Sequence, residues 1–290
     1  MKKLRVGFIG LGLMGNLMAK NIQKAGFPLS VYNRSIKKTE EFKANDITVV
    51  ASPKELVPQS DIIITMVTGA RDVEDVLFGP HGVITASEKV STVIDMSTIG
   101  PTAAKSIGNT LASHGIEFLD APVTGGTYGA KNAELTIFIG GSTEVYTRAK
   151  SVLESMGNNL QYMGPVGSGQ AIKMINNYII ASSIVALSEG MLLADTMGLS
   201  RKSLSEALST TPSVSLAMVR KIQNYVTNEY PMNFTIKNMH KDLSLAAAEM
   251  DDAKKLSLLS LVEDIYNKAD ENGLSESDYS QVIDALKDRT

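Results

Sequence analysis

The sequence contains no cysteine among its 290 residues. It can therefore form no disulfide, no cysteine-ligated metal site and no thiol nucleophile. This absence fits a reducing compartment, and we expect a cytoplasmic protein. Histidine is scarce as well. The three histidines stand far apart, at positions 81, 114 and 240, and no acidic cluster has metal-ligand spacing, so we expect no metal site.

An excess of charge of one sign is also absent. The chain has 28 basic and 31 acidic residues and a net charge of −3, which leaves no basic footprint for nucleic acid and no polybasic anchor for a membrane. The basic start and the apolar run after it are typical of a secretory leader, but glycines interrupt that run. The most apolar later stretch, residues 171–187, contains lysine, asparagine and serine, which do not suit a lipid-facing span. We expect neither nucleic acid nor membrane as a partner.

Two patterns follow one another along the chain. Residues 1–164 alternate short apolar runs with helix-like segments, which is typical of a parallel sheet covered on both faces. After the glycine-rich segment "GPVGSGQ", residues 171–290 show helical periodicity with polar breaks. We predict a doubly wound α/β domain followed by an all-α domain. The predicted strands are residues 4–10, 28–33, 46–50, 61–67, 92–96, 116–121, 134–141 and 158–164.

The segment "GLGLMG" follows the first predicted strand and opens a helix, as a dinucleotide-binding G-x-G-x-x-G must. Gly10 permits the tight turn, Gly12 lets the backbone approach a pyrophosphate, and Gly15 allows close helix–strand packing. The helix N-terminus favours the phosphate charge. The alternative is a glycine turn that only connects two elements. The candidate cofactor contacts are Gly10, Leu11, Gly12, Leu13, Met14 and Gly15.

The end of the second predicted strand indicates which dinucleotide binds. An acidic residue at this place accepts hydrogen bonds from the ribose 2′-hydroxyl of NAD. This chain has Asn33, Arg34 and Ser35 instead, with Lys37 and Lys38 close behind. A guanidinium can bind a 2′-phosphate and stack on adenine. We therefore expect NADP(H) to be preferred over NAD(H), the alternative being a solvated basic patch at a helix start.

Two further segments are candidates for the chemistry. In "DAPVTGG", Thr124, Gly125 and Gly126 would offer a hydroxyl and backbone N–H groups to a small carboxylate substrate, although such a segment can equally be a turn. In "GQAIKMINN", Lys173 and Asn177 stand four residues apart and share a helix face. An ammonium in an apolar helix is costly unless something uses or pairs it. It can act as a proton donor, or it can reach the surface or pair with an acid.

Five motifs in order carry a family resemblance: "GFIGLGLMGNLMAKNIQKAG", "DMST", "DAPVTGG", "GSGQAIKMINN" and "HKDLSLA". Over nearly the whole chain they resemble the β-hydroxyacid dehydrogenase family, which includes 3-hydroxyisobutyrate dehydrogenases and the tartronate, glyoxylate and succinic semialdehyde reductases. The resemblance implies a Rossmann domain over residues 1–164 and an all-α domain for substrate binding and oligomerisation over residues 165–290. It also implies a long interdomain helix and assembly as a homodimer or homotetramer.

The resemblance further implies hydride transfer between nicotinamide C4 and the carbonyl carbon of a small acid. Lys173 would exchange a proton with the carbonyl oxygen, assisted by Asn177. Thr124, Gly125 and Gly126 would hold the substrate carboxylate. Val67, Thr68, Thr98 and Lys241 would contact the cofactor, and Asp242 would support Lys241.

The substrate stays open at this stage. Thr124 stands where the family usually has serine, and Ala133 and Glu134 replace a glycine common before the "LTI" strand. The segments "VYNRS", "VLFG" and "DMSTIGP" resemble the glyoxylate and succinic semialdehyde reductases, whereas "DAPVTGG" with "TIFIGG" resembles the 3-hydroxyisobutyrate group. Tartronate semialdehyde is a further candidate of the same family. The rival functions are an imine reductase of the same architecture, against which Lys173 counts, and a non-catalytic NADP-binding protein. A hydrolase or a nucleotide triphosphatase is not expected, because neither G-x-S-x-G nor a Walker A motif occurs.

Overall fold

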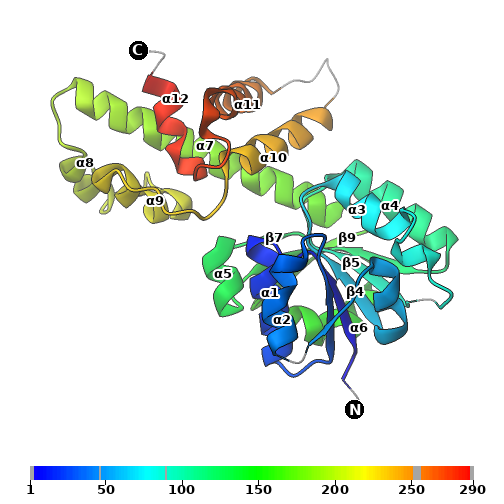
Figure 1. Ribbon diagram of the computed structural model, residues 1–290. Helices are drawn as coiled ribbons and strands as arrows, with labels where there is room; N and C mark the ends of the chain where they lie inside the picture. Colours follow the sequence, from blue (N-terminus) through cyan, green and yellow to red (C-terminus); the bar gives the residue numbers. More distant parts are fainter. Residues whose placement is uncertain (1–2, 46, 89, 251–255, 288–290) are drawn as a thin grey trace. The chain divides into compact units, whose positions relative to one another are not determined.

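The computed structural model describes residues 3–45, 47–88, 90–250 and 256–287. The chain divides into two compact units, Met1–Lys173 and Met174–Thr290. The first unit is blue to green in Figure 1 and the second is green to red. The first is an α/β unit and the second is helical, as the sequence predicted.

One nine-stranded sheet forms the centre of the first unit, in the order β3-β2-β1-β4-β5-β6-β8-β7, with β9 paired to β8. Among β1 to β6, each pair of neighbouring strands is parallel. The strands are β1 (Val6–Ile9), β2 (Leu29–Tyr32), β3 (Thr48–Val49), β4 (Ile62–Thr65), β5 (Thr92–Asp95), β6 (Glu117–Asp120), β7 (Val123–Thr124), β8 (Thr136–Gly141) and β9 (Asn159–Gly164).

The far end of the sheet corrects the prediction of a parallel sheet. Strand β8 runs antiparallel to both β6 and β7, and β9 then runs parallel to β8. Residues 125–135, which connect β7 to β8, contain only the short helix α5 (Gly126–Asn132) and bring the chain back beside the strands that it has just left. A parallel neighbour would require a crossover to the opposite end of the sheet. The direct return therefore reverses the strand.

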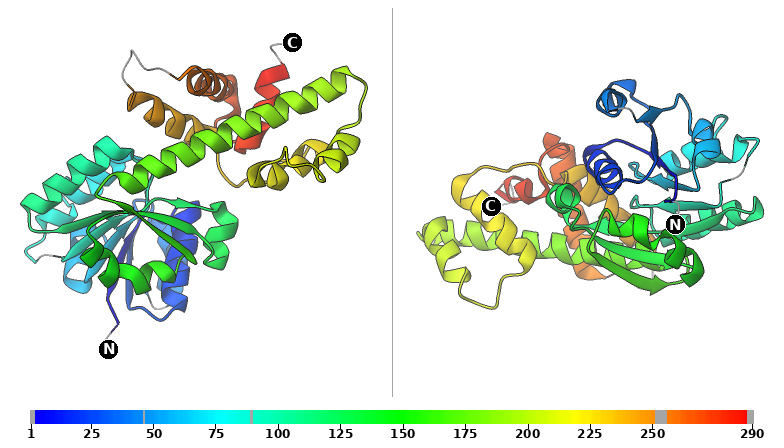
Figure 2. Two further views of the ribbon diagram at one scale, coloured as in Figure 1. Left: turned by 180° about the vertical axis from the view of Figure 1, so that it is seen from behind. Right: turned by 90° about the horizontal axis from the view of Figure 1, so that it is seen from below.

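Helices cover both faces of this sheet (Figures 1 and 2). Apolar side chains of α1 (Leu13–Lys24), α2 (Glu40–Ala44) and α6 (Thr143–Glu154) pack on one face. Those of α3 (Ala70–Phe78) and α4 (Pro101–Ser113) pack on the other. Strands β1, β4 and β5 are buried at every position, which is why their sequences read as continuous apolar runs. The 3₁₀ turns are η1 (Ile36–Thr39), η2 (Pro53–Gln59) and η3 (Val83–Thr85).

The second unit is built on the long helix α7 (Ser168–Thr196), which begins in the first unit. Of the described helices, α7 alone is long and apolar enough to cross a membrane, a test that a core helix also passes. Its apolar residues share a core with α10, α11 and the C-terminal turns. The remaining elements are α8 (Arg201–Leu208), α9 (Leu216–Thr227), α10 (Ile236–Ala248), α11 (Ser257–Ala269), η5 (Asp270–Leu274), η6 (Tyr279–Val282) and α12 (Ile283–Lys287).

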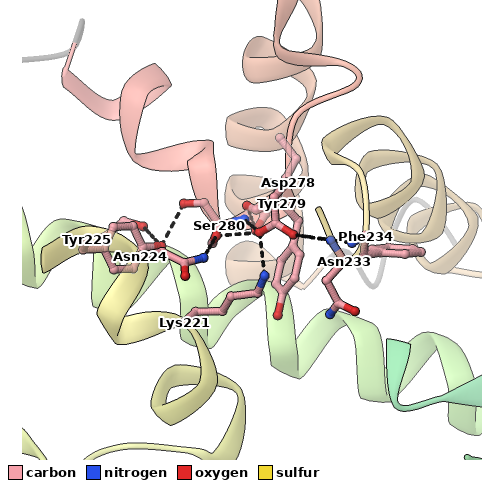
Figure 3. Close-up of polar contacts among 10 residues, drawn as sticks. Lys221, Asn224, Tyr225, Asn233, Phe234, Asp278, Tyr279 and Ser280 are labelled. Atoms are coloured by element: carbon pink, nitrogen blue, oxygen red, sulfur yellow. Dashed lines mark hydrogen bonds and ion pairs between the residues drawn. The ribbon is translucent and has the colours of Figure 1, made fainter. Parts of the chain in front are cut away.

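A buried ion pair lies inside this helical unit (Figure 3). The Lys221 ammonium on α9 lies 2.7 Å from a carboxylate oxygen of Asp278 and 4.9 Å from the centre of the Tyr279 ring. The same carboxylate accepts hydrogen bonds from the main-chain N–H groups of Asn233 and Phe234. Because each charge has a partner, the pair joins α9 to the segment before α10 and to the C-terminal turns.

Hydrogen bonds extend this polar core on the side of α7. The Asn224 amide donates to the Ser280 hydroxyl at 3.0 Å, and the Tyr225 hydroxyl donates to the Ser280 carbonyl at 2.9 Å (Figure 3). The Tyr225 hydroxyl also lies 2.9 Å from the hydroxyl of Ser188 on α7. These residues are all buried, so this network stabilises the helical unit.

Candidate active site

The glycine loop after β1 has the geometry that a dinucleotide requires. Gly10 has a φ of +101°, and a Cβ there would collide with the Met66 carbonyl oxygen. A Cβ on Gly15 would collide with the carbonyl oxygen of Gly10. A Cβ on Gly12, in contrast, would meet no protein atom within 4 Å, so this backbone is open to a ligand. The first and third glycines thus serve packing, and the second leaves room for a pyrophosphate.

Helix α1 begins at this loop without a side-chain cap. Its N-cap is Gly12, and no acidic residue lies in its first turn. The first N–H groups of a helix have no intrahelical partner and attract an anion. The donor set and the open backbone therefore fit the diphosphate of a dinucleotide. Of the other predicted loop contacts, Leu11 is buried, Met14 is half-buried and Leu13 is exposed.

Loops from three neighbouring strands meet at this edge of the sheet. The last residues of four parallel strands pair in one row: Ile9 of β1, Thr65 of β4, Asp95 of β5 and Asp120 of β6. The strand order reverses between β1 and β4, and ligands bind outside such a switch point. Of the predicted cofactor contacts in these loops, Thr68 is exposed, while Val67 and Thr98 are half-buried. The Val67 N–H donates to the Ser97 hydroxyl at 2.9 Å, which joins the loops after β4 and β5.

Asn33 and Arg34, which follow β2, have different roles. The side-chain oxygen of Asn33 accepts the Leu11 N–H at 2.8 Å, and its amide donates to the Ser35 carbonyl at 2.9 Å. Asn33 thus fixes the glycine loop to the end of β2. The Arg34 side chain is 90% exposed, and its guanidinium lies 3.6 Å from a carboxylate oxygen of Asp72 on α3. Sequence reasoning missed Asp72, because nothing near it in the chain indicates that α3 reaches the end of β2.

A buried carboxyl group lies at the centre of the edge. Asp95 accepts the Thr65 hydroxyl at 2.7 Å and, more weakly, the Ser97 N–H at 3.3 Å. Its other carboxylate oxygen has no hydrogen-bond partner. Complete burial raises the pKa of Asp95 to about 6, and these hydrogen bonds only partly oppose the rise. Near neutral pH this group therefore carries a charge that the fold compensates only in part.

The predicted carboxylate-binding residues lie where β7 ends. Thr124 is half-buried and is the last residue of β7. Gly125 and Gly126 follow with φ angles of +129° and +62°, so both positions favour glycine. A Cβ at Gly125 would lie 3.3 Å from a side-chain carbon of Leu135. The glycines are therefore required by the turn, whatever it binds.

The first turn of α7 lies against the same sheet edge. The Asp120 carboxylate accepts the N–H groups of Gly167 at 2.7 Å and of Gln170 at 2.9 Å. Burial raises the pKa of Asp120, and the main-chain donors oppose the rise. A Cβ at Gly169 would lie 2.5 Å from the Phe138 carbonyl oxygen and 2.9 Å from that of Asp120. The glycines of "GSGQ" thus let this helix start against β6 and β8.

Lys173 and Asn177 lie one turn apart on α7. Both are buried, with exposures of 7% and 3%. The Asn177 amide donates to a carboxylate oxygen of Asp242 on α10 at 2.6 Å. The other oxygen of Asp242 lies 3.0 Å from the Lys241 ammonium. Asp242 therefore contacts Lys241, the residue that the resemblance implied it would support, and also holds Asn177, which the sequence did not indicate.

Comparison with known proteins decides the family. Residues 5–164 match the family model described as the NAD binding domain of 6-phosphogluconate dehydrogenase. Residues 167–286 match the one described as NAD-binding of NADP-dependent 3-hydroxyisobutyrate dehydrogenase. The chain belongs to the β-hydroxyacid dehydrogenase family. Like its relatives, it is an NAD(P)-dependent oxidoreductase.

Relatives of the family align over almost the whole chain. The mitochondrial 3-hydroxyisobutyrate dehydrogenase of Mus musculus is 36% identical, with 99% of this chain and 88% of the relative covered. The 2-hydroxy-3-oxopropionate reductase of Escherichia coli is 34% identical over 98% of this chain and 97% of its own length. The structure of a Mycobacterium tuberculosis 3-hydroxyisobutyrate dehydrogenase with L-serine is 30% identical and superposes with a TM-score of 0.89, covering 98% of this chain and 99% of that one.

Proposed function

We propose that this β-hydroxyacid dehydrogenase prefers NADP(H) and interconverts a small β- or γ-hydroxyacid and its semialdehyde, with Lys173 as the general acid and base. One observation carries the proposal. Lys173 is buried one turn after residues whose N–H groups bind Asp120, the last residue of β6. Asp120 lies in the same row of strand ends as Ile9, which directly precedes the glycine loop. Three strand spacings separate β1 from β6, or about 14 Å, which a dinucleotide spans.

Each step of the reaction has a residue of suitable chemistry. The bound nicotinamide supplies the hydride in reduction and accepts it in oxidation. In reduction the Lys173 ammonium donates a proton to the oxygen of the carbonyl group as its carbon gains the hydride. In oxidation the amine takes this proton back. Asn177, held by Asp242, orients the substrate oxygen or the ammonium, and Thr124, Gly125 and Gly126 bind the carboxylate.

The cofactor preference depends on the end of β2. The exposed guanidinium of Arg34 can turn toward a 2′-phosphate. The residue that follows β2 is Asn33 and not an acid, so no carboxylate there repels this phosphate. Asp72 opposes this preference, because its carboxylate competes with the 2′-phosphate for Arg34 and repels the phosphate. NADP(H) is therefore the preferred cofactor and NAD(H) the second, with Lys241 a further cofactor contact.

The substrate belongs to a class of small acids. The relatives are named for 3-hydroxyisobutyrate and for 2-hydroxy-3-oxopropionate, which both carry an oxygen on the carbon β to a carboxylate. We place the substrate of this chain in the same class, with succinic semialdehyde and glyoxylate as the longer and shorter alternatives. The methyl group of Thr124 favours the smaller acids, since the family usually has serine there.

Initial rates test the proposal. NADPH and NADH oxidation are measured with methylmalonate semialdehyde, tartronate semialdehyde, succinic semialdehyde, glyoxylate and a cyclic imine, in wild type, Lys173→Ala and Lys173→Arg. We expect kcat to fall at least 100-fold in both variants while NADPH affinity is retained, because arginine keeps the charge but does not release a proton. Unchanged rates in Lys173→Ala would refute the role of the lysine. Turnover of the imine alone would favour an imine reductase, and tight NADPH binding without any turnover would favour a non-catalytic binding protein.

We also propose that the chain forms a homodimer or homotetramer through α7. An apolar stripe in the second unit supports this: Ile175, Ile179 and Leu193 are 54%, 56% and 55% exposed. Together with exposed Ala186 they lie within about 40° on the helix circumference, over a length of about 27 Å. Sedimentation of the wild type at micromolar concentration should show the oligomer, and Ile179→Glu should dissociate it. A monomeric wild type would exclude this assembly.

A further inference from the structure

Gln170 is a completely buried amide that binds only main-chain groups of one loop. Its side-chain oxygen accepts the N–H groups of Ile99 at 3.0 Å and of Gly100 at 3.2 Å. Its side-chain nitrogen donates to the Ser97 carbonyl at 2.8 Å. Gln170 is 0% exposed and lies in the first turn of α7, three residues before Lys173.

The loop that Gln170 binds has functional neighbours. Residues 97–100 follow β5, precede α4, and include Thr98, a proposed cofactor contact. The Ser97 hydroxyl accepts the Val67 N–H, so this loop also sets the loop after β4. Gly100 has a φ of +82°, a conformation that the Gln170 oxygen stabilises through the Gly100 N–H. One amide on α7 therefore determines the path of a loop at the cofactor edge of the sheet.

A second side chain fixes the same helical turn from the other side. Asp120, the last residue of β6, accepts the main-chain N–H groups of Gly167 and Gln170. Gln170 and Asp120 together form the α7 anchor. Asp120 fixes the main chain of the turn to the sheet, and the Gln170 side chain fixes the loop to the turn. An apolar side chain at position 170 would fill the space but would leave three buried main-chain groups without partners.

We propose that Gln170 is a positioning residue for hydride transfer: it holds Lys173 and the loop of residues 97–100 in one fixed geometry. The inference rests on the proposed function, because it requires that Lys173 exchange the proton. General acid catalysis needs the proton donor and the reacting oxygen at a fixed short distance and orientation, and small displacements lower the rate steeply. Gln170 acts through Lys173 and the loop and touches neither hydride nor proton.

The test compares two substitutions at this position with a control. Gln170→Met keeps the volume and removes all three bonds, and Gln170→Glu keeps the two acceptor bonds and loses the donor. Asn224→Leu removes a buried amide bond in the helical unit, to its partner Ser280, and controls for lost stability. All are measured for NADPH dissociation constant, KM, kcat and the deuterium isotope effect on kcat with 4-deuterated NADPH.

We expect kcat of Gln170→Met to fall about 10- to 100-fold, with KM within threefold and a larger isotope effect, because the chemical step becomes rate-limiting. The kcat of Gln170→Glu should fall less than that of Gln170→Met. Asn224→Leu should keep both the wild-type kcat per folded molecule and the wild-type isotope effect. The amides of Ile99 and Gly100 should exchange hydrogen faster in Gln170→Met, which reports the anchor without any turnover. If Gln170→Met does not fold, Gln170→Glu is measured for the same quantities. Wild-type kcat and isotope effect in folded Gln170→Met would overturn the inference, as would unchanged amide exchange.

A double-mutant cycle separates this inference from the proposed function. If Gln170 acts through Lys173, adding Gln170→Met to Lys173→Ala should lower kcat by less than threefold further. Full additivity of the two losses overturns the positioning role and leaves the proposed function intact. Wild-type turnover in Lys173→Ala alone overturns the proposed function, and the inference with it.

Discussion

Two lysine side chains are buried among the described residues, and their surroundings differ. Lys221 lies in the helical unit, 5% exposed, with its ammonium against the Asp278 carboxylate and over an aromatic ring. Lys173 lies at the end of the α/β unit, one turn after the α7 anchor, which binds the last residue of β6. Burial alone therefore does not identify a catalytic lysine. The catalytic role that we propose for Lys173 depends instead on its place next to the sheet edge.

The buried carboxyl groups of the two units also differ in their surroundings. In the helical unit, the Asp278 charge is matched by an ammonium as well as by N–H donors. In the α/β unit, hydrogen-bond donors hold Asp95 and Asp120, and burial raises the pKa of each. The helical unit thus compensates its buried charges, whereas the sheet edge keeps carboxyl groups whose ionisation opposes folding. Such uncompensated groups concentrate at functional sites.

The largest effect should come from breaking the structural pair. Lys221→Met should lower the free energy of unfolding by about 3–5 kcal/mol, because it leaves a buried carboxylate without its counter-charge. Urea denaturation measures this, and kcat per folded molecule should stay within twofold of the wild type. Adding Asp278→Asn should restore part of the stability. The matched Lys173→Met should instead lower kcat per folded molecule at least 100-fold. If both substitutions had the same profile, the contrast between the lysines would fail.

The second effect concerns the sheet edge and depends on pH. The pKa of Asp95 is raised to about 6, so the folded protein binds this proton more tightly than the unfolded chain does. Its contribution to stability is present below about pH 4 and is lost as the pH rises through about 6. Asp95→Asn should therefore gain stability over the wild type across this window, by up to about 3 kcal/mol at neutral pH. Melting temperatures at pH 4.5 and 7.5 measure it. If the melting temperatures of Asp95→Asn and the wild type differed equally at both pH values, Asp95 would not carry an uncompensated charge.

The smallest effect belongs to an exposed ion pair. Arg34 and Asp72 lie 3.6 Å apart with the arginine side chain 90% exposed, so their attraction should add little stability. Arg34→Ala should instead weaken NADPH binding about tenfold more than NADH binding, through loss of a charge-assisted contact. Asp72→Ala should shift the preference further toward NADPH. Fluorescence titration with both cofactors measures these shifts, and equal losses for both in Arg34→Ala would refute the proposed basis of preference.

Much of the α/β unit could be predicted from the sequence because its strands are buried on both faces. Runs such as "VGFI" and "IIIT" lie in β1 and β4, and the glycines at 10 and 15 stand where close packing requires them. The direction of β8 could not be predicted, because an apolar run has the same pattern in either direction. Only the length of the connection through α5 decides it.

The candidate site could be predicted in part for a related reason. Lys173 and Asn177 stand out because polar residues in an apolar helix require an explanation. Their partners do not stand out, since each depends on contacts across the fold: Asp242 follows Asn177 by 65 residues, and Asp72 is an ordinary acidic residue on α3. Gln170 lay inside a quoted motif, but its bonds to Ser97 and Gly100 involve main-chain atoms that no sequence pattern records.

The continuity of α7 limits how this protein can be rearranged. The two units divide between Lys173 and Met174, inside a helix of 29 residues and not in a linker. A cut at this boundary would separate Lys173 from Asn177, so neither unit can be exchanged as a cassette without rebuilding a helical turn. Even a single inserted residue between them would rotate Asn177 by about 100° away from the face that carries Lys173. Chimaeras with relatives should therefore be joined before Gly167 or beyond Asn177, and insertions within this turn should be strongly selected against.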